Sequence, residues 1–453
     1  MNRFEPYLEI LKKAVVDLDQ GRGSFGQTEG TEETERMREI EKTVLGVAHR
    51  LKGNYPFHHP QYAGQMLKPP HPAAWLAYAL TMSINPNNHA LDGGPPTSEM
   101  EKESVQMLGE MVGYEKPFLG HLTSGGTVAN LEALFVAREI RPGKAIAASA
   151  NAHYTHQRMS RVLNTPFLTI PTDPSGMPDI SFVEENAEKI GTVVVTTGTT
   201  GLGVVEPLEE ILELSKRYSF RVHADAAYGG FFKIIGDQLP SSQVWELLCE
   251  CDSIVIDPHK HGLQPYGCGA ILYKDPASGQ HLRHDSPYTY FTSDELHLGE
   301  ISLECSRAGA SAAAFWTTLQ LLPLTQAGLG SILAKARNAA TRFVHLLSQH
   351  DRWEIYLEPD LDIVTYFKTP KKRTISELNR VNQQLFRSGM SMREEGFHLS
   401  LFEIPSSQFI EKFPGYKADH PNAVVLRSVF MKEEHEGFID EFTRRLVKTG
   451  LDV

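Results

Sequence analysis

Two polar residues that could do chemistry stand where apolar segments end. The first is Lys260: the run 253–256 leads into Asp257-Pro258-His259-Lys260, and another apolar run, 269–273, follows. Lysine is seldom buried, so this residue is either a charged hairpin tip or a desolvated amine of lowered pKa that can form a Schiff base with a carbonyl. The context favours the amine, and the neighbouring His259 could meet an anionic group.

The second is Asp225, in the segment 221–230 (RVHADAAYGG). An aspartate at the end of a strand is usually a turn former or a helix cap. A carboxylate in such apolar surroundings could instead pair with a ring nitrogen and keep a pyridinium protonated and electron-withdrawing. The small side chains of Ala226 and Ala227 would let a flat ring lie against the backbone.

Three further motifs lie upstream. The segment 123–127 (TSGGT) opens an amphipathic helix, and a glycine loop at a helix N-terminus suits a phosphate, although the same residues make an ordinary N-cap. His153, in 151–156, and the turn 198–203 (GTTGLG) have equally ordinary explanations when taken alone. The sequence contains neither GxGxxG nor GxxxxGK[ST], which excludes the usual dinucleotide and P-loop sites.

The elements that must position these residues alternate along the chain. From Leu91 to Leu272 short β-branched runs alternate with amphipathic stretches, which is typical of βαβ units on a parallel sheet. The clearest predicted strands are 192–196, 220–224, 253–257 and 269–273. Ligands of such sheets lie at the carboxyl ends of the strands, so those ends are where we expect the chemistry.

The length of 453 residues allows two domains. We expect an N-terminal helical arm over 1–54, with a second helix at about 32–50, a large α/β domain over 55–328 and a small α+β domain over 329–453. The proline-rich stretch 55–72 predicts an ordered loop. An alanine-rich helix is expected near 310–322, and strands of the small domain near 353–367 and 423–430.

Composition limits the partners and the compartment. With 56 acidic and 44 basic residues the net charge is −12, which disfavours nucleic acid and anionic membranes as ligands. Four cysteines without a CxxC pair favour a reducing compartment. Because no signal peptide and no long apolar run is present, we expect a cytoplasmic protein. The histidine spacing lacks the common zinc motifs, so no metal is expected.

Taken together and in this order, the motifs resemble the group II pyridoxal 5'-phosphate (PLP) dependent amino-acid decarboxylases, which include the aromatic amino-acid, tyrosine and glutamate decarboxylases. The resemblance runs from about Tyr55 to Leu322 and is most specific at 257–260 and 223–228. It implies the PLP-dependent transferase-like fold of type I, a mainly parallel sheet flanked by helices, with a homodimer as the working form. It also implies decarboxylation of an L-amino acid, aromatic or acidic, to the amine and CO2.

The resemblance also implies roles for individual residues. Lys260 would form the internal aldimine and Asp225 would pair with the pyridine nitrogen, while His153 stacks on the ring and Ala227 supports its other face. The phosphate would be held by Gly125, Gly126 and Thr127 with help from His259. Thr200 would lie near the cofactor or the substrate carboxylate. Ser306 and Arg307 match a segment near the dimer interface that reaches the neighbouring subunit's phosphate, although a helix-starting serine with a surface arginine is an equal alternative.

For the substrate, Tyr62 matches the family's aromatic residue, and Arg307 or Arg427 could bind a carboxylate. A loop tyrosine, Tyr288 in preference to Tyr290, would donate the proton after CO2 leaves. Two alternatives stay open at this point. One is another type I PLP enzyme, a carbon–carbon lyase or an aminotransferase, and the other is a non-catalytic binding protein on the same scaffold.

Overall fold

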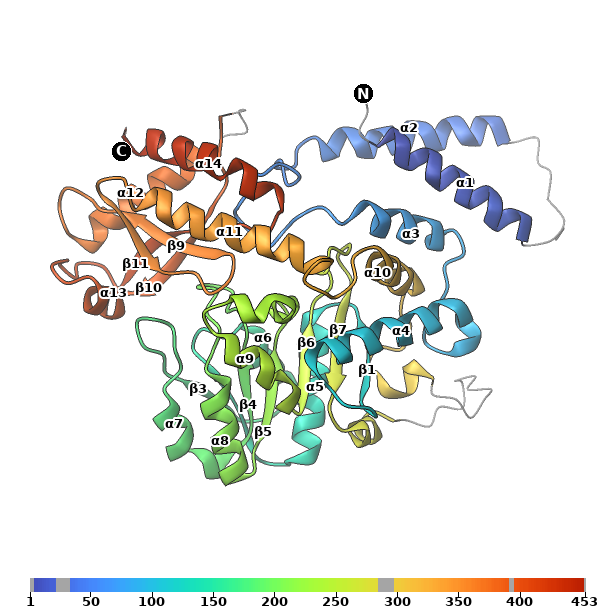
Figure 1. The fold of residues 1–453 in the computed structure, drawn as a ribbon, viewed down its shortest axis with the longest axis horizontal. Helices are drawn as coiled ribbons and strands as arrows, with labels where there is room; N and C mark the ends of the chain where they lie inside the picture. The colour runs from blue at the N-terminus through green and yellow to red at the C-terminus, as the bar shows by residue number, and fades with distance from the viewer. Residues whose placement is uncertain (1–3, 22–32, 284–296, 391–394, 452–453) are drawn as a thin grey trace.

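The computed structural model describes residues 4–21, 33–283, 297–390 and 395–451. Its centre is a seven-stranded sheet in the order β1-β7-β6-β5-β4-β2-β3 (Figure 1). The strands are β1 (Leu119–Thr123), β2 (Ala145–Ser149), β3 (Phe167–Ile170), β4 (Ile190–Thr196), β5 (Arg221–Asp225), β6 (Ser253–Ile256) and β7 (Gly269–Tyr273). The four strands predicted from the sequence are therefore present, with ends that shift by at most two residues.

The sheet is parallel from β6 to β3, whereas β7 runs antiparallel to both β6 and β1. The connection 257–268 contains no helix, in keeping with this reversal, because a parallel return usually runs through a crossover helix. This connection carries Lys260. The strands β4 to β7 are buried almost throughout, as expected for a sheet covered on both faces.

Helices pack on the sheet and build one large apolar core with it. They are α4 (Pro95–Val112), α5 (Gly126–Ile140), α6 (Thr155–Val162), α7 (Ile180–Glu185), α8 (Leu208–Tyr218), α9 (Ser242–Leu247) and α10 (Gly309–Leu321). Short 3-10 helices cover Leu91–Gly93, Ala187–Lys189, Gly230–Gln238, Leu248–Glu250, Pro276–His281 and Leu298–Ile301. The alanine-rich helix predicted near 310–322 is α10, and it packs against α4 and against α3 (Pro72–Met82).

The C-terminal part of the chain forms a second, antiparallel sheet in the order β10-β11-β9-β8. Its strands are β8 (Trp353–Leu357), β9 (Ile363–Lys368), β10 (Ser400–Pro405) and β11 (Asn422–Val429), and its helices are α11 (Leu329–Leu347), α12 (Ile375–Gly389), α13 (Ser406–Lys412) and α14 (Glu434–Leu451). Of these strands, the sequence analysis predicted β8, β9 and β11 but not β10. That strand lies at the sheet edge and is only partly buried, so its hydrophobic pattern is weak.

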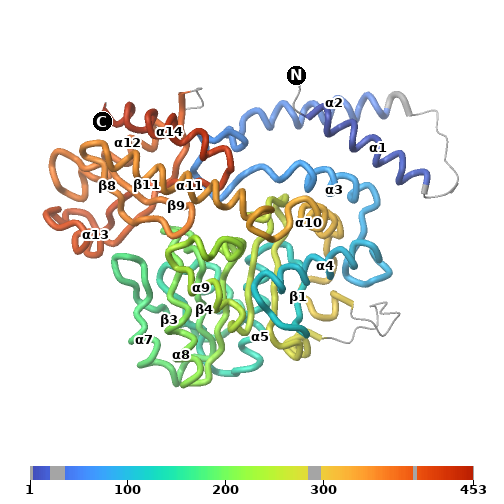
Figure 2. The backbone as a smooth tube through the Cα atoms, viewed as in Figure 1, coloured from blue at the N-terminus to red at the C-terminus, as the bar shows by residue number. Residues whose placement is uncertain are grey.

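The N-terminal residues form α1 (Glu5–Gly21) and α2 (Glu33–Leu51), which extend along one side of the molecule (Figure 2). The proline-rich stretch after α2 contains no helix until α3 (Pro72–Met82), as predicted. The helix α1 packs on α3, where the ring of Phe4 lies 6.1 Å from that of Trp75. In the described part of the chain, no helix is long and apolar enough to cross a membrane.

Candidate active site

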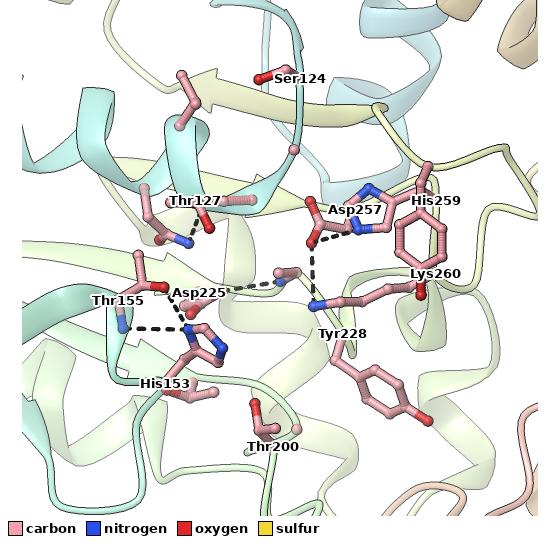
Figure 3. A pocket seen from close by; sticks show the side chains of 18 of the residues that line it. Ser124, Thr127, His153, Thr155, Thr200, Asp225, Tyr228, Asp257, His259 and Lys260 are labelled. Atoms are coloured by element: carbon pink, nitrogen blue, oxygen red, sulfur yellow. Dashed lines mark hydrogen bonds and ion pairs between the residues drawn. The ribbon is translucent and has the colours of Figure 1, made fainter. Parts of the chain in front are cut away.

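A cavity of about 390 Å³ lies at the carboxyl ends of β4 and β5, beside the start of α5. Among the residues that line it are nine of the predicted site residues: Gly125, Gly126, Thr127, His153, Thr200, Asp225, Ala227, His259 and Lys260. They come from five separate segments of the chain and meet in one place (Figure 3). The cavity thus lies at the carboxyl ends of the strands, where the sequence analysis expected the functional residues.

Lys260 extends across the cavity from the connection after β6 (Figure 3). Its Nζ lies 3.2 Å from Oδ2 of Asp257, a buried carboxylate that also lies 3.5 Å from Nε2 of His259. The turn that holds the lysine is closed by its own backbone, since Lys260 N–H donates to the carbonyl of Asp257. Asp257 therefore fixes the lysine amine, a role that the sequence analysis did not assign.

Asp225 is the last residue of β5, and its carboxylate is buried at the cavity wall. Its Oδ1 accepts a hydrogen bond from the Ala227 N–H at 3.2 Å, and its Oδ2 lies 2.8 Å from Nε2 of His156. Burial alone would raise the pKa of Asp225, but the hydrogen bond and charge of His156 and the nearby Lys260 hold it below its usual value. The group is therefore an anion at neutral pH.

His153 lies just before α6 and presents its ring to the cavity. Its Nδ1 accepts from the Thr155 N–H at 3.3 Å and lies 2.6 Å from the Thr155 hydroxyl. Burial lowers the pKa of His153, and the charge of Lys260 lowers it further. The ring is therefore neutral at neutral pH with its proton on Nε2, which suits it for packing flat against another ring without adding charge.

One end of the cavity is made by the turn that opens α5. Gly125 has a φ of +146°, which strongly favours glycine, and a Cβ built on Gly126 would lie 2.6 Å from Oδ2 of Asp257. The hydroxyl of Ser124 and that of Thr127 border the same space, and His259 is held there by a contact of 2.7 Å between its Nδ1 and the Cys268 carbonyl. Backbone N–H groups at a helix N-terminus favour an anion.

Comparison with known proteins agrees with this geometry. Residues 51–369 match the model of the pyridoxal-dependent decarboxylase conserved domain. The chain belongs to the pyridoxal-dependent decarboxylase family. It is 26% identical to the L-tyrosine decarboxylase of Enterococcus faecium over 75% of this chain and 74% of that one. It is 28% identical to the probable L-tyrosine/L-aspartate decarboxylase of Methanosphaera stadtmanae, over 79% of this chain and 88% of that one.

The fold agrees as well. The structure of mouse CSAD superposes with a TM-score of 0.79 at 19% identity, covering 99% of both chains. This confirms the predicted type I fold. Because the chain belongs to the pyridoxal-dependent decarboxylase family, it uses PLP. The cavity fits that cofactor in size and in the chemistry of its donors: an amine, a buried carboxylate and the N-terminus of a helix.

Four predicted residues lie outside the cavity lining of the decarboxylase. Ser306 is exposed and its hydroxyl accepts a hydrogen bond from the Asn87 amide at 3.2 Å. Arg307 is buried, pairs with Glu101 and donates to the carbonyls of Leu122 and Asn88, both at 2.9 Å. Its place is thus in the packing of α4 and β1, and not on the surface.

Tyr62 and Arg427 are not among the residues that line the cavity. The Tyr62 carbonyl accepts from Nζ of Lys432 at 2.5 Å. Arg427, on β11, donates from Nε to the Gly201 carbonyl at 3.0 Å, beside Thr200 of the cavity wall, and its Nη2 is buried without a hydrogen-bond partner among the described residues. The two predicted loop tyrosines, Tyr288 and Tyr290, fall outside the described residues.

Proposed function

We propose that the decarboxylase acts on an aromatic L-amino acid, with L-tyrosine as the substrate to test first. The observation that carries this proposal is the lining of the cavity, in which the described residues include Tyr154, Tyr228 and Tyr266 but no arginine. An acidic side chain would need a cation of its own, preferably a bidentate guanidinium.

The test is CO2 release from L-tyrosine, L-aspartate and L-glutamate by the purified holoenzyme. Discrimination by unpaired buried polar groups can be large, so we expect kcat/KM for tyrosine to exceed that for either acid by at least about tenfold. A preference for aspartate or glutamate would overturn the proposal. Stoichiometric formation of a keto acid in place of CO2 would instead indicate transamination.

Lys260 is proposed to hold PLP covalently. When bound, PLP supplies the electron sink into which the substrate's Cα bond can break. Borohydride reduction of the holoenzyme followed by peptide mapping should find the pyridoxyl group on Lys260. An unmodified Lys260 in cofactor-replete protein would contradict this assignment.

The remaining cofactor contacts are proposed from the same cavity. Asp225 keeps a proton on the ring nitrogen, His153 packs on one face of the ring and Ala227 supports the other. Gly125, Gly126 and Thr127 bind the phosphate at the start of α5, with His259 beside them, and Thr200 borders the substrate. The supporting observation is that all of these residues line one cavity.

Arg427 is proposed to hold the substrate's α-carboxylate, close to Tyr62. It is a buried cation for which no described carboxylate forms an ion pair, and its Nη2 has no described hydrogen-bond partner. Arg307, by contrast, is already paired with Glu101. Because only interactions that are stronger in the transition state than in the ground state accelerate the chemical step, this contact must orient the carboxylate without making its loss costly.

The proton that replaces CO2 is proposed to come from Tyr288 or Tyr290. Replacement of the donor by phenylalanine should lower the yield of amine relative to CO2, because the carbon that has lost CO2 then lacks the group that protonates it. Measuring amine and CO2 in the same reactions of Tyr288→Phe and Tyr290→Phe gives this ratio. Unchanged ratios in both variants would exclude the loop tyrosines.

We also propose that the decarboxylase is a homodimer, and the support lies in α2. The residues Met37, Ile40, Val44, Val47 and Leu51 repeat at heptad spacing, and their exposed fractions lie between 48% and 59%. Such a stripe is the seam that pairs helices, and most of the stability of a helix in a protein comes from packing of its apolar face. Ser306 would face the second copy. Sedimentation should show a dimer that Val44→Asp weakens and the neighbouring control Thr43→Asp does not.

The assignment of three structural units, 1–54, 55–328 and 329–453, is part of the same proposal and agrees with the two separate sheets. A cytoplasmic location is proposed because all four cysteines are free thiols. Neither nucleic acid nor a membrane is a proposed partner, given the net charge of −12. Limited proteolysis would test the boundaries of the structural units, and cell fractionation would test the cytoplasmic location.

A further inference from the structure

His156 makes a contact that neither the motifs nor the proposed cofactor roles use. Its Nε2 lies 2.8 Å from Oδ2 of Asp225, and both side chains are almost completely buried. An ionised carboxylate can only accept, so Nε2 carries the proton and donates it to this bond. The bond is thus charge-assisted, the stronger class of hydrogen bond in proteins.

The backbone of His156 is anchored in its own helix, so its ring is held through Nε2 by Asp225. His156 N–H donates to the carbonyl of His153 at 3.1 Å, and the hydroxyl of Ser160 donates to the His156 carbonyl at 2.8 Å. The start of α6 therefore places two histidines near the site. His153, just before the helix, lines the cavity, while His156, in the first turn, contacts Asp225 behind the cavity wall.

Other titratable groups near Asp225 do not replace this contact. His223, whose ring lies 6.5 Å from that of His156, bonds to Asn130 and Ser253, and burial lowers its pKa to about 3. Glu206 accepts from Ser149 and from the Thr196 N–H, and burial raises its pKa to about 7. Apart from His156, the described donor to the Asp225 carboxylate is the Ala227 N–H.

We propose that His156 is a positioning residue for the cofactor: its Nε2–H fixes the plane of the Asp225 carboxylate and keeps that carboxylate ionised, so that Asp225 can hold a proton on the ring nitrogen of PLP. Without His156, the buried carboxylate keeps one donor. Burial then favours its neutral form, which cannot hold that proton. The proposal rests on the proposed role of Asp225 but not on the choice of substrate.

The test compares the apoprotein's affinity for PLP and the visible absorption of the bound cofactor in matched variants. His156→Leu removes the donor but fills the space, whereas His156→Gln can place an amide N–H near the position of Nε2. Since a hydrogen bond to a charged group is worth a factor of about ten to one hundred, His156→Leu should bind PLP about that much more weakly and with an altered absorption band. His156→Gln should recover part of both.

Ser160→Ala is the control, because it removes a hydrogen bond of α6 without touching Asp225; its PLP affinity and absorption should match the wild type. If His156→Leu fails to fold, His156→Asn takes its place, since its amide is too short to reach Oδ2, and it must show the same loss. Wild-type affinity and absorption in the folded donor-less variant would overturn the proposal. So would a loss that His156→Gln does not reduce.

Asp225→Asn separates the two assignments. If this variant keeps the wild-type absorption, the role of Asp225 itself is wrong, and the proposal for His156 is overturned with it. If Asp225→Asn is altered while His156→Leu is not, only the role of His156 is wrong. Neither result depends on decarboxylation of any substrate, so a wrong choice of substrate leaves the test intact.

Discussion

The variant Gly126→Ala probes the close packing of Gly126 against the carboxylate of Asp257. A Cβ at this position would lie 2.6 Å from Oδ2 and 2.9 Å from Oδ1 of Asp257. Ordinary contact begins at 3.4 Å, so the carboxylate must retreat by about 0.8 Å. Asp257 is buried at the end of β6, and its Oδ2 is the atom 3.2 Å from Nζ of Lys260. The retreat therefore displaces the partner of the lysine.

The expected magnitude follows from two opposing effects. Alanine favours a helix over glycine by up to about 1 kcal/mol, while overpacking a buried site costs about 1–3 kcal/mol. The free energy of unfolding should therefore fall by no more than about 3 kcal/mol. Activity should fall much further, because a misplacement of about 1 Å at a reacting group can cost about a hundredfold in rate.

The assay is kcat/KM for CO2 release together with denaturant unfolding of the same preparations. Gly437→Ala is the matched control, since Gly437 lies in α14 with no atom within 4 Å of the added Cβ, and it should leave the activity unchanged. A double-mutant cycle sharpens the test: in an Asp257→Ala background the new methyl group has no carboxylate to displace, so Gly126→Ala should cost little more. Full activity in the single variant, or an equal loss in both backgrounds, would refute the reasoning.

Three further variants test the buried polar groups around the site, each by denaturant unfolding. Burial and the charge of Lys68 lower the pKa of Lys432 to about 7, so the unfolded chain holds this proton to higher pH than the folded protein does. The free energy of unfolding should therefore rise by about 2 kcal/mol between pH 7 and 9, and Lys432→Met should remove that rise. Tyr228→Phe removes a hydrogen bond of 2.6 Å to the buried Asp362 and should lower the free energy of unfolding by about 1.5–3 kcal/mol. A decrease below about 0.5 kcal/mol would mean that water replaces the hydroxyl. Arg307→Met leaves Glu101 buried and unpaired and should cost about 3–5 kcal/mol, whereas a neutral result would show that this pair is not desolvated.

The strand-end residues could be predicted from the sequence because one strand carries its own information. An apolar run that stops at Asp225, and another that stops just before Asp257 to Lys260, place those side chains at one edge of a parallel sheet whatever else the chain does. The glycine loop before α5 is local in the same sense. Its dihedral angle and its helix follow from residues 123–127 alone.

Contacts between distant elements were not predictable in that way. Asp257 meets Gly126 from more than a hundred residues away, and no spacing within either motif encodes their approach. The bond between His156 and Asp225 likewise joins α6 to β5. A signal for it existed in the second histidine of the segment 151–156, but a buried histidine has so many structural uses that its partner is known only from the fold.

Arg307 and Arg427 also show what the sequence could not predict, because one of these buried arginines is paired with a carboxylate and the other is not. A guanidinium is always charged, so burial demands compensation. Arg307 has it in Glu101, which neutralises the pair and leaves no attraction for a substrate anion. Arg427 donates only to carbonyl and hydroxyl oxygens of Gly201, Gly64 and Ser400 among the described residues, which solvate the cation but leave its charge in place. The uncompensated charge of Arg427, next to the cavity wall, would attract a substrate carboxylate. Whether a buried arginine keeps such a charge depends on the partners that the fold places around it, which the sequence alone does not reveal.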